Sequence, residues 1–336
     1  MGKLIRRMGI PTFAVSALLL VVLIAAYVMG QSLPVLFTDI LRRVGMNGIL
    51  VLAMVPSIKS GVGPNFALPI GIVGGLFALM CCMQMDLMGW SLIGCSILLA
   101  IIICGLMGWA YGKLTIATYT GFSIVAFFNI LWLSLPFSNR KMGWMLGDGL
   151  RETIQMDGFA ADKIVSNFLS FNIGEVTIPT GMILLLLLTC FVVSVFFKTK
   201  TGLAIYAGGV NPKFAEAAGL NIDRSRVIAN IISTVLAGIG IIIYSQGYGY
   251  AQIYNGPLNM AFPAVAAVLI GGATATKASC VNVVVGVCIF QGLMTAAMPV
   301  ANALFTGTDL SDIMRQVIQN GVILYALTQV KKGGDR

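Results

Sequence analysis

Three long runs of the sequence contain no charged residue. They cover 13–29, 93–107 and 182–197. A helix rises about 1.5 Å per residue, so each run is long enough, or nearly so, to cross about 30 Å of hydrocarbon. Backbone groups in lipid must be paired within the spanning segment, and open sheet edges leave theirs unpaired. The runs therefore predict an all-α integral membrane protein.

The composition supports this prediction and excludes other classes. The chain is 58% hydrophobic and 10% charged, whereas a soluble domain carries about 25% charge. A net charge of +9 would suggest nucleic acid in a soluble protein, but basic residues also line the cytoplasmic mouths of membrane helices. We therefore expect a membrane lipid environment and no nucleic-acid partner. The basic start of the chain and the apolar stretch 10–30 predict a retained first helix, because that stretch is too long for a typical signal peptide.

The apolar segments predict about ten transmembrane helices in one domain over 1–336. Their approximate ranges are 10–30, 44–58, 62–83, 90–111, 114–136, 178–198, 225–247, 258–272, 279–299 and 311–330. Two polar interruptions separate them, one over 138–175 and the other over 198–226. We expect a first repeat over about 1–137, an external loop over 138–177, and a second repeat over about 178–336.

The distribution of basic residues predicts the orientation. With the N-terminus inside, most of the 21 Lys and Arg residues fall in cytoplasmic segments, as the positive-inside rule requires. Arg42 and Arg43 are exceptions, and we interpret them as part of an amphipathic outer turn. The pattern predicts a multi-pass protein of the bacterial plasma (inner) membrane with both termini in the cytoplasm.

A short motif occurs twice. Asn-Phe-Ala-Leu-Pro at 65–69 is followed, 194 positions later, by Asn-Met-Ala-Phe-Pro at 259–263, and each copy continues into an apolar stretch that ends in Gly-Gly. Five spans per copy is an odd number, so the second copy would be inverted, as in many transporters. The alternative is chance similarity between two glycine-rich apolar stretches.

Polar and aromatic residues at membrane depth are candidates for the substrate pathway, because such side chains usually face a bundle interior or a cavity. Those at the broken helices are Asn65, Phe66, Asn259 and Phe262, and those at the outer end of the seventh span are Gln246, Tyr248, Tyr250 and Gln252. Further buried candidates are Asn129, Asn282 and Gln291. The alternative is interhelical hydrogen bonding, worth about 0.6 kcal/mol on average.

These residue types also suggest a solute class. Amides hydrogen-bond hydroxyl groups, and aromatic rings stack on ring faces. We expect a small neutral solute, a monosaccharide first and a nucleoside or other heterocycle second. A proton- or sodium-coupled secondary transporter is the weaker alternative, because no acidic residue lies in the middle of a predicted span.

The polar segment 198–226 contains a short predicted helix. Asn211 is a favourable N-cap, Pro212 suits the first helical position, and Gly219 suits the residue after the C-cap. A helix of about two turns over 211–219 is marginal by itself and needs a packing partner. The alternative is an ordinary loop helix with solvated charges.

The pattern Gly-Gly-x-Asn-Pro-x-x-Ala-x-x-x-Gly over 208–219 resembles the coupling helix of ABC importer permeases of the simple-sugar (ribose/galactose-type) branch. That branch also contains nucleoside and furanose-signal permeases. The resemblance implies a second permease subunit (homo- or heterodimer), a cytosolic ABC ATPase and an extracytoplasmic solute-binding protein. It also implies ATPase contacts, made by Asn211, Pro212, Phe214, Ala215, Glu216 and Gly219.

Two stretches differ from the sugar permeases. The segment 61–67 lacks the Asp and Ser of their Gly-x-Asp-Leu-Ser-x-Gly motif. The segment 271–277 keeps only the first glycine pair of their Gly-Gly-x-x-x-x-Gly-Gly motif. The resemblance therefore indicates the family and leaves the solute open.

The sequence predicts a transport subunit rather than an enzyme. It contains no Gly-x-x-x-x-Gly-Lys-[Ser/Thr] phosphate loop, so ATP would be hydrolysed by a separate subunit. It has no histidine, and its seven cysteines lie in apolar runs without zinc-site spacing. We expect no metal and no cofactor, and no catalytic cluster supports the alternative of a membrane-embedded enzyme.

Overall fold

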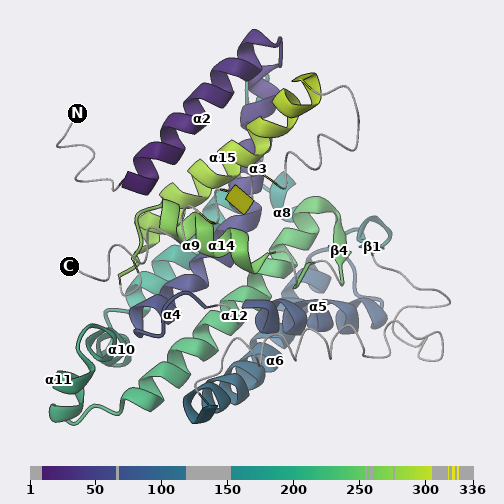
Figure 1. Cartoon of the computed structure of the whole chain (residues 1–336). Helices are drawn as coiled ribbons and strands as arrows, with labels where there is room; N and C mark the ends of the chain where they lie inside the picture. The colour runs from purple at the N-terminus through teal and green to yellow at the C-terminus, as the bar shows by residue number, and fades with distance from the viewer. Residues whose placement is uncertain are drawn as a thin grey trace.

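A computed structural model describes residues 10–65, 68–118, 153–253, 256–257, 260–274, 277–304, 317, 320–321 and 324. This part of the chain is mainly helical (Figure 1). The long helices are α2 (Ile10–Val28), α3 (Leu33–Leu52), α5 (Leu68–Gln84), α6 (Gly89–Thr118), α9 (Thr180–Phe196), α12 (Ile222–Tyr248) and α15 (Cys280–Leu304). The shorter ones are α4 (Met54–Lys59), α8 (Ile164–Asn167), α10 (Lys200–Val210), α11 (Pro212–Ala217) and α14 (Ala261–Ile270).

Two small antiparallel ribbons and one 3-10 turn complete the described elements. Strand β1 (Thr153–Gln155) pairs with β4 (Tyr250–Gln252), and β2 (Phe171–Ile173) pairs with β3 (Val176–Ile178). The turn covers Asp157–Phe159. The predicted helical architecture is confirmed, because helices make up most of the described residues. The two ribbons were not predicted from the apolar runs.

Several helices are long and apolar enough to cross a membrane. In the described part of the chain they are Gly89–Leu114, Ile222–Tyr248 and Cys280–Ala301, and the pair α9 and α10, bent by 80°, is a fourth if it forms one span. Shorter apolar helices lie at Thr12–Val28, Leu68–Gln84 and Ala261–Ile270. The predicted spans 114–136 and 311–330 lie largely outside the described residues, so the number of ten stays a prediction.

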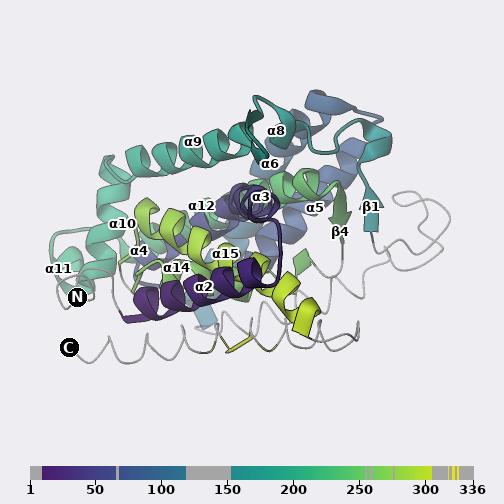
Figure 2. The same ribbon diagram turned by 90° about the horizontal axis from the view of Figure 1, so that it is seen from above.

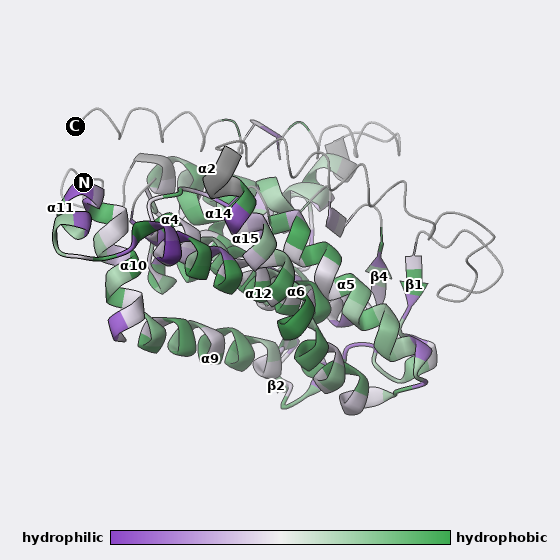
Figure 3. Ribbon diagram, turned by 90° about the horizontal axis from the view of Figure 1, so that it is seen from below, coloured by the Kyte–Doolittle hydropathy of each residue, from purple (hydrophilic) through white to green (hydrophobic). Residues whose placement is uncertain are grey.

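Hydrophilic residues gather at the two ends of the structure. They surround α10 and α11 at one end and β1 and β4 at the other, with hydrophobic helices between (Figure 3). Helix α9 has large apolar side chains on its exposed surface, among them Leu187 and Phe191. A hydrophobic middle between two polar ends is the arrangement that a bilayer requires.

Helices α3 and α12 form the centre of the structure. Helix α12 packs against α5, α6, α4 and α3, and α3 packs against α9, α14 and α15. Helices α2 and α9 lie on opposite sides of this centre (Figure 2). Each central helix thus packs mainly against helices from the other predicted repeat. An inverted repeat gives such an exchange, and the division into two repeats stays a prediction.

The segment that includes β1 and α8 is fixed to the C-terminal end of α12. The backbone N–H of Met156 donates to the carbonyl of Gly249 at 2.9 Å, and that of Lys163 donates to the carbonyl of Gln246 at 2.8 Å. Pairing of β1 with β4 extends the contact. This attachment shapes the end of α12 that contributes to the candidate site.

Candidate functional site

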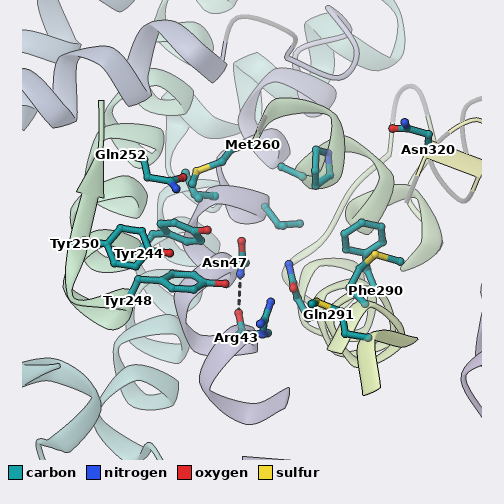
Figure 4. A pocket seen from close by; sticks show the side chains of 16 residues that line it. Arg43, Asn47, Tyr244, Tyr248, Tyr250, Gln252, Met260, Phe290, Gln291 and Asn320 are labelled. Atoms are coloured by element: carbon teal, nitrogen blue, oxygen red, sulfur yellow. Dashed lines mark hydrogen bonds between the residues drawn. The ribbon is translucent and has the colours of Figure 1, made fainter. Parts of the chain in front are cut away.

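A cavity of about 660 Å³ lies between α3, α12, α14 and α15 (Figure 4). Its polar lining consists of Arg43, Asn47, Tyr244, Tyr248, Tyr250, Gln252, Gln291 and Asn320. Its apolar lining consists of Leu50, Val51, Met260, Pro263, Ala264, Phe290, Met294 and Met298. Half of these lining residues are polar, so the cavity offers hydrogen-bonding groups together with apolar and aromatic surface to a small molecule.

Three tyrosine rings form one wall of the cavity. Tyr244 and Tyr248 lie one turn apart near the end of α12, and their ring centroids are 4.8 Å apart. The helix ends at Gly249, which has a φ of 85°, a left-handed conformation that glycine adopts without strain. The chain then enters β4, where the ring centroid of Tyr250 lies 5.5 Å from that of Tyr248. The three rings provide aromatic faces and hydroxyl groups together.

Arg43 and Asn47 of α3 lie opposite these rings, with Gln291 of α15 beside them (Figure 4). Arg43 and Asn47 are one helical turn apart, and Asn47 Nδ2 donates to the backbone carbonyl of Arg43 at 2.9 Å. The Arg43 Cζ atom lies 5.9 Å from the centroid of the Tyr248 ring, within the usual range of a cation–π contact. This side of the cavity therefore combines a cation with amide groups.

The cavity brings together some of the residues predicted for the pathway. Tyr248, Tyr250, Gln252 and Gln291 line it, and Phe66, Asn129 and Asn259 lie outside the described residues. Sequence reasoning missed the lining residues Arg43, Asn47 and Tyr244. A signal was available for two of them, since Arg43 and Asn47 are four residues apart and so share one face of a helix. Arg43 lies in the middle of α3, and the interpretation as an outer turn was wrong.

Asn65 is not among the cavity-lining residues, and its side chain links helices instead. Its Nδ2 atom donates to Ser233 Oγ at 2.7 Å, and Ser233 Oγ donates to the carbonyl of Ala53 at 2.6 Å. Ala53 is the junction between α3 and α4, and both polar side chains are buried. The chain of hydrogen bonds therefore ties the segment before α5 and the end of α3 to α12.

Three other predicted pathway residues also lie outside the cavity lining. Gln246 is buried, and its Oε1 atom accepts from the backbone N–H of Val165 at 3.1 Å. Asn282 Nδ2 donates to the carbonyl of Gly271 at 2.7 Å, between α15 and the end of α14. Phe262 is exposed near the start of α14. The first two side chains hold elements together, which is the alternative that the sequence left open.

Replacing Ser233 with alanine tests the structural role of the hydrogen bonds around Asn65. The change removes two buried hydrogen bonds, and we expect it to lower the free energy of unfolding by about 1–3 kcal/mol. The measurement is thermal unfolding of the purified protein in detergent. Ser225→Ala is the control, because the hydrogen bond from Ser225 Oγ to the carbonyl of Asn221 lies at the solvent-exposed start of α12 and its loss should cost little. Equal stability of the two variants would contradict the assigned role.

Helix α11 has both predicted caps. Asn211 Oδ1 accepts from the backbone N–H of Phe214 at 3.1 Å, and Pro212 is the first helical residue. At the other end, Gly219 has a φ of 78°, its N–H donates to the carbonyl of Glu216, and that of Leu220 donates to the carbonyl of Ala215. This pair of bonds is a Schellman motif. The prediction of a short capped helix at this point in the chain is confirmed.

The surface of α11 differs from the one that the resemblance implied. Ala215 is fully buried within the chain, where α11 packs on α10 and α12. Phe214 and Glu216 are exposed, and the Phe214 side chain has 69% of its surface accessible. Ala215 is therefore turned away from any partner in this structure. The exposed aromatic side chain is the stronger candidate for a partner contact.

A close backbone contact joins α10 to the end of α4. A Cβ atom on Gly209 would overlap the carbonyl oxygen of Lys59 and come within 2.8 Å of the backbone nitrogen of Gly61. The Lys59 Nζ atom lies 4.1 Å from the centroid of the Phe197 ring. Partial burial lowers the pKa of the Lys59 ammonium below its ordinary value. The contact at Gly209 places α10 directly against the end of α4.

Comparison with known proteins places the chain in a family. The model of the branched-chain amino acid transport system / permease component family matches residues 3–327. The chain belongs to this permease family. The resemblance to importer permeases is confirmed at this level, and the protein is a transport component of a multi-pass membrane type rather than an enzyme.

Curated relatives in this permease family differ in their named substrates. The chain is 28% identical over 140 residues to the nucleoside ABC transporter permease protein NupB of Lactococcus lactis, covering 41% of this chain and 36% of the relative. It is 35% identical over 112 residues to the fructose import permease protein FruG of Bifidobacterium longum, covering 33% and 31%.

A longer match is to the high-affinity branched-chain amino acid transport system permease protein LivH of Salmonella typhimurium, 22% identical over 249 residues, covering 72% and 77%. The nucleoside and fructose matches span about a third of those relatives. No solved structure matches this permease.

Proposed function

We propose that this permease is the membrane-spanning subunit of an ATP-driven importer. The observation that carries the proposal is α11, a helix of six residues with both ends capped and an exposed Phe214. So short a helix is stabilised by packing, and its exposed face suits a cytosolic ATPase. The ABC transporter names of the nucleoside and fructose relatives support the same proposal.

The proposed orientation puts both termini and α11 in the cytoplasm. Helix α11 and the β1–β4 ribbon lie at opposite ends of the structure (Figures 1 and 2), so the segment 138–177 would then face outside. The further partners in this proposal are a second permease subunit and an extracytoplasmic solute-binding protein. The location would be a bacterial plasma or inner membrane.

The proposed solute is a small polar molecule that contains a ring. The cavity of about 660 Å³ has the size of a site for such a molecule, and its amides and tyrosine hydroxyls suit hydroxyl groups. A monosaccharide is the first candidate, and the fructose relative supports it. A nucleoside is the second, supported by the three adjacent tyrosine rings and by the nucleoside relative. A neutral solute was expected because the predicted pathway contained few charged residues. The lining of the cavity, however, includes the charged residue Arg43.

Replacing Phe214 with alanine tests the proposed ATPase contact. We expect wild-type permease, purified from its own membrane, to carry an ABC ATPase with it, and the variant to lose that partner. A central aromatic contact is worth about 2 kcal/mol or more, which corresponds to a loss of affinity of about thirtyfold. The measurement is the amount of copurified ATPase, together with ATP-dependent solute uptake.

Lys213→Ala is the matched control, because this neighbouring side chain is also exposed and surface substitutions usually change stability by less than about 0.5 kcal/mol. Both variants should reach the membrane in normal amounts. Absence of any ATPase from the wild-type preparation would refute the proposed function. Full ATPase recovery with Phe214→Ala would refute the assigned contact alone.

A further inference from the structure

Arg43 is a charged side chain in the interior of the helix bundle. It is at the eleventh position of the 20 residues of α3, and α3 packs against α9, α12, α14 and α15. Its neighbours Val44 and Met46 are buried, whereas Arg43 is half-buried and lines the cavity. An ionisable residue in a membrane bundle is costly and usually faces a water-filled cavity with a functional role.

The guanidinium of Arg43 has no carboxylate partner among the described residues. The ion pair among the described residues joins Lys163 to Asp162. Asp39 lies one turn before Arg43 on α3 but forms no ion pair with Arg43. The described lining of the cavity contains no aspartate or glutamate. The guanidinium contacts the Tyr248 ring, whose centroid lies 5.9 Å from the Cζ atom, and Arg43 lines the cavity.

The surroundings of Arg43 combine donors with ring faces. Asn47, Gln291 and the tyrosine hydroxyls lie around the same space (Figure 4). A guanidinium binds a carboxylate or phosphate through two parallel hydrogen bonds, a geometry that a neutral hydroxyl group does not use. The tyrosine rings beside it can stack on the ring of the same solute.

We propose that Arg43 binds an oxyanion group, a carboxylate or a phosphate, on the ring-bearing solute and thereby selects it. This inference rests on the proposed function and narrows it, because the solute is then an acid rather than a neutral sugar or nucleoside. The tyrosine wall holds the ring, and the α3 wall holds the charged group. Arg43 is a specificity-determining residue in this arrangement.

Pairs of compounds that differ in an oxyanion group test the proposal. The probes are galactose with galacturonate and uracil with orotate, added to the full-length permease in lipid nanodiscs together with any ATPase that copurifies. Binding is measured from the ligand-induced rise in the unfolding temperature over a concentration series. We expect the acid of at least one pair to bind at least about tenfold more tightly than its neutral partner, the factor that a charge-assisted hydrogen bond provides.

Three variants assign that preference to one residue. Arg43→Gln should remove the preference for the acid and leave binding of the neutral partner within about threefold, and Arg43→Lys should keep part of the preference because it keeps the charge. Arg42→Gln is the matched control, since Arg42 is the adjacent arginine of α3 and is not among the described lining residues. It should bind all four compounds as the wild type does.

Several results would overturn the proposal. They are binding of neither acid, equal binding of acid and neutral partner, and a preference that survives in Arg43→Gln. A fall in the unfolding temperature of Arg43→Gln with the preference intact would show that Arg43 only supports Tyr248. Copurification of the ATPase is a separate readout, so the proposed function can stand when this inference fails.

Discussion

Replacing Gly209 with alanine is expected to abolish solute uptake, whereas the same change at Gly208 is expected to be tolerated. A Cβ atom on Gly209 would overlap the Lys59 carbonyl and approach the Gly61 nitrogen at 2.8 Å. Both are backbone atoms, which cannot rotate away as a side chain does, so α10 must move off α4. Overpacking of this kind costs about 1–3 kcal/mol or more.

Gly208 provides a matched control for this change. It is also buried in α10, but its added Cβ would meet only the Cγ1 atom of Ile222, at 3.8 Å, an ordinary contact. Alanine is also the better helix former by about 1 kcal/mol. The measurements are ATP-dependent uptake and the unfolding temperature, at matched expression. Normal uptake by Gly209→Ala would show that the contact between α10 and α4 is not needed for transport.

Replacing Ala215 with tryptophan is expected to unfold the end of the molecule that contains α11. Ala215 is fully buried within the chain, so the larger ring has no space and the cost should again be about 1–3 kcal/mol or more. We expect a lower unfolding temperature and loss of the ATPase. The resemblance alone implied a different cause for that loss, a block of the ATPase groove with the fold intact.

The two explanations are separated by a second tryptophan in the same helix. Ala217 is exposed, so Ala217→Trp should leave the unfolding temperature unchanged. Circular dichroism during heating, with copurified ATPase as the second readout, distinguishes the cases. If Ala215→Trp melts as the wild type does and still loses the ATPase, then Ala215 faces the partner and the packing seen here is not the functional one.

Features set by neighbours in the chain were predictable from the sequence. The capped helix α11 depends on Asn211, Pro212 and Gly219, each of which acts within a few residues of itself. The apolar runs also predicted membrane helices, because chain length and hydrocarbon thickness decide that question.

Features set by distant elements were not predictable in this way. The role of Gln246 depends on α8, about 80 positions earlier in the chain, which hydrogen-bonds to it. Arg43 was assigned to an outer turn because it was an exception to the positive-inside rule. The cavity that it lines is formed only when α3, α12, α14 and α15 have assembled. Ala215 was placed on the outer surface of α11 because residue type does not reveal which face of so short a helix packs inward.

The central position of α3 also affects how the protein is made. Its residues include Asp39, Arg42 and Arg43, and each charge costs about 2.5–3.5 kcal/mol at the middle of a lipid-exposed helix on insertion scales. The helices that cover it, α9, α12, α14 and α15, all emerge from the ribosome later. We therefore expect α3 to remain at the insertion machinery or at the bilayer surface during synthesis, and to be buried only when the second half of the chain arrives.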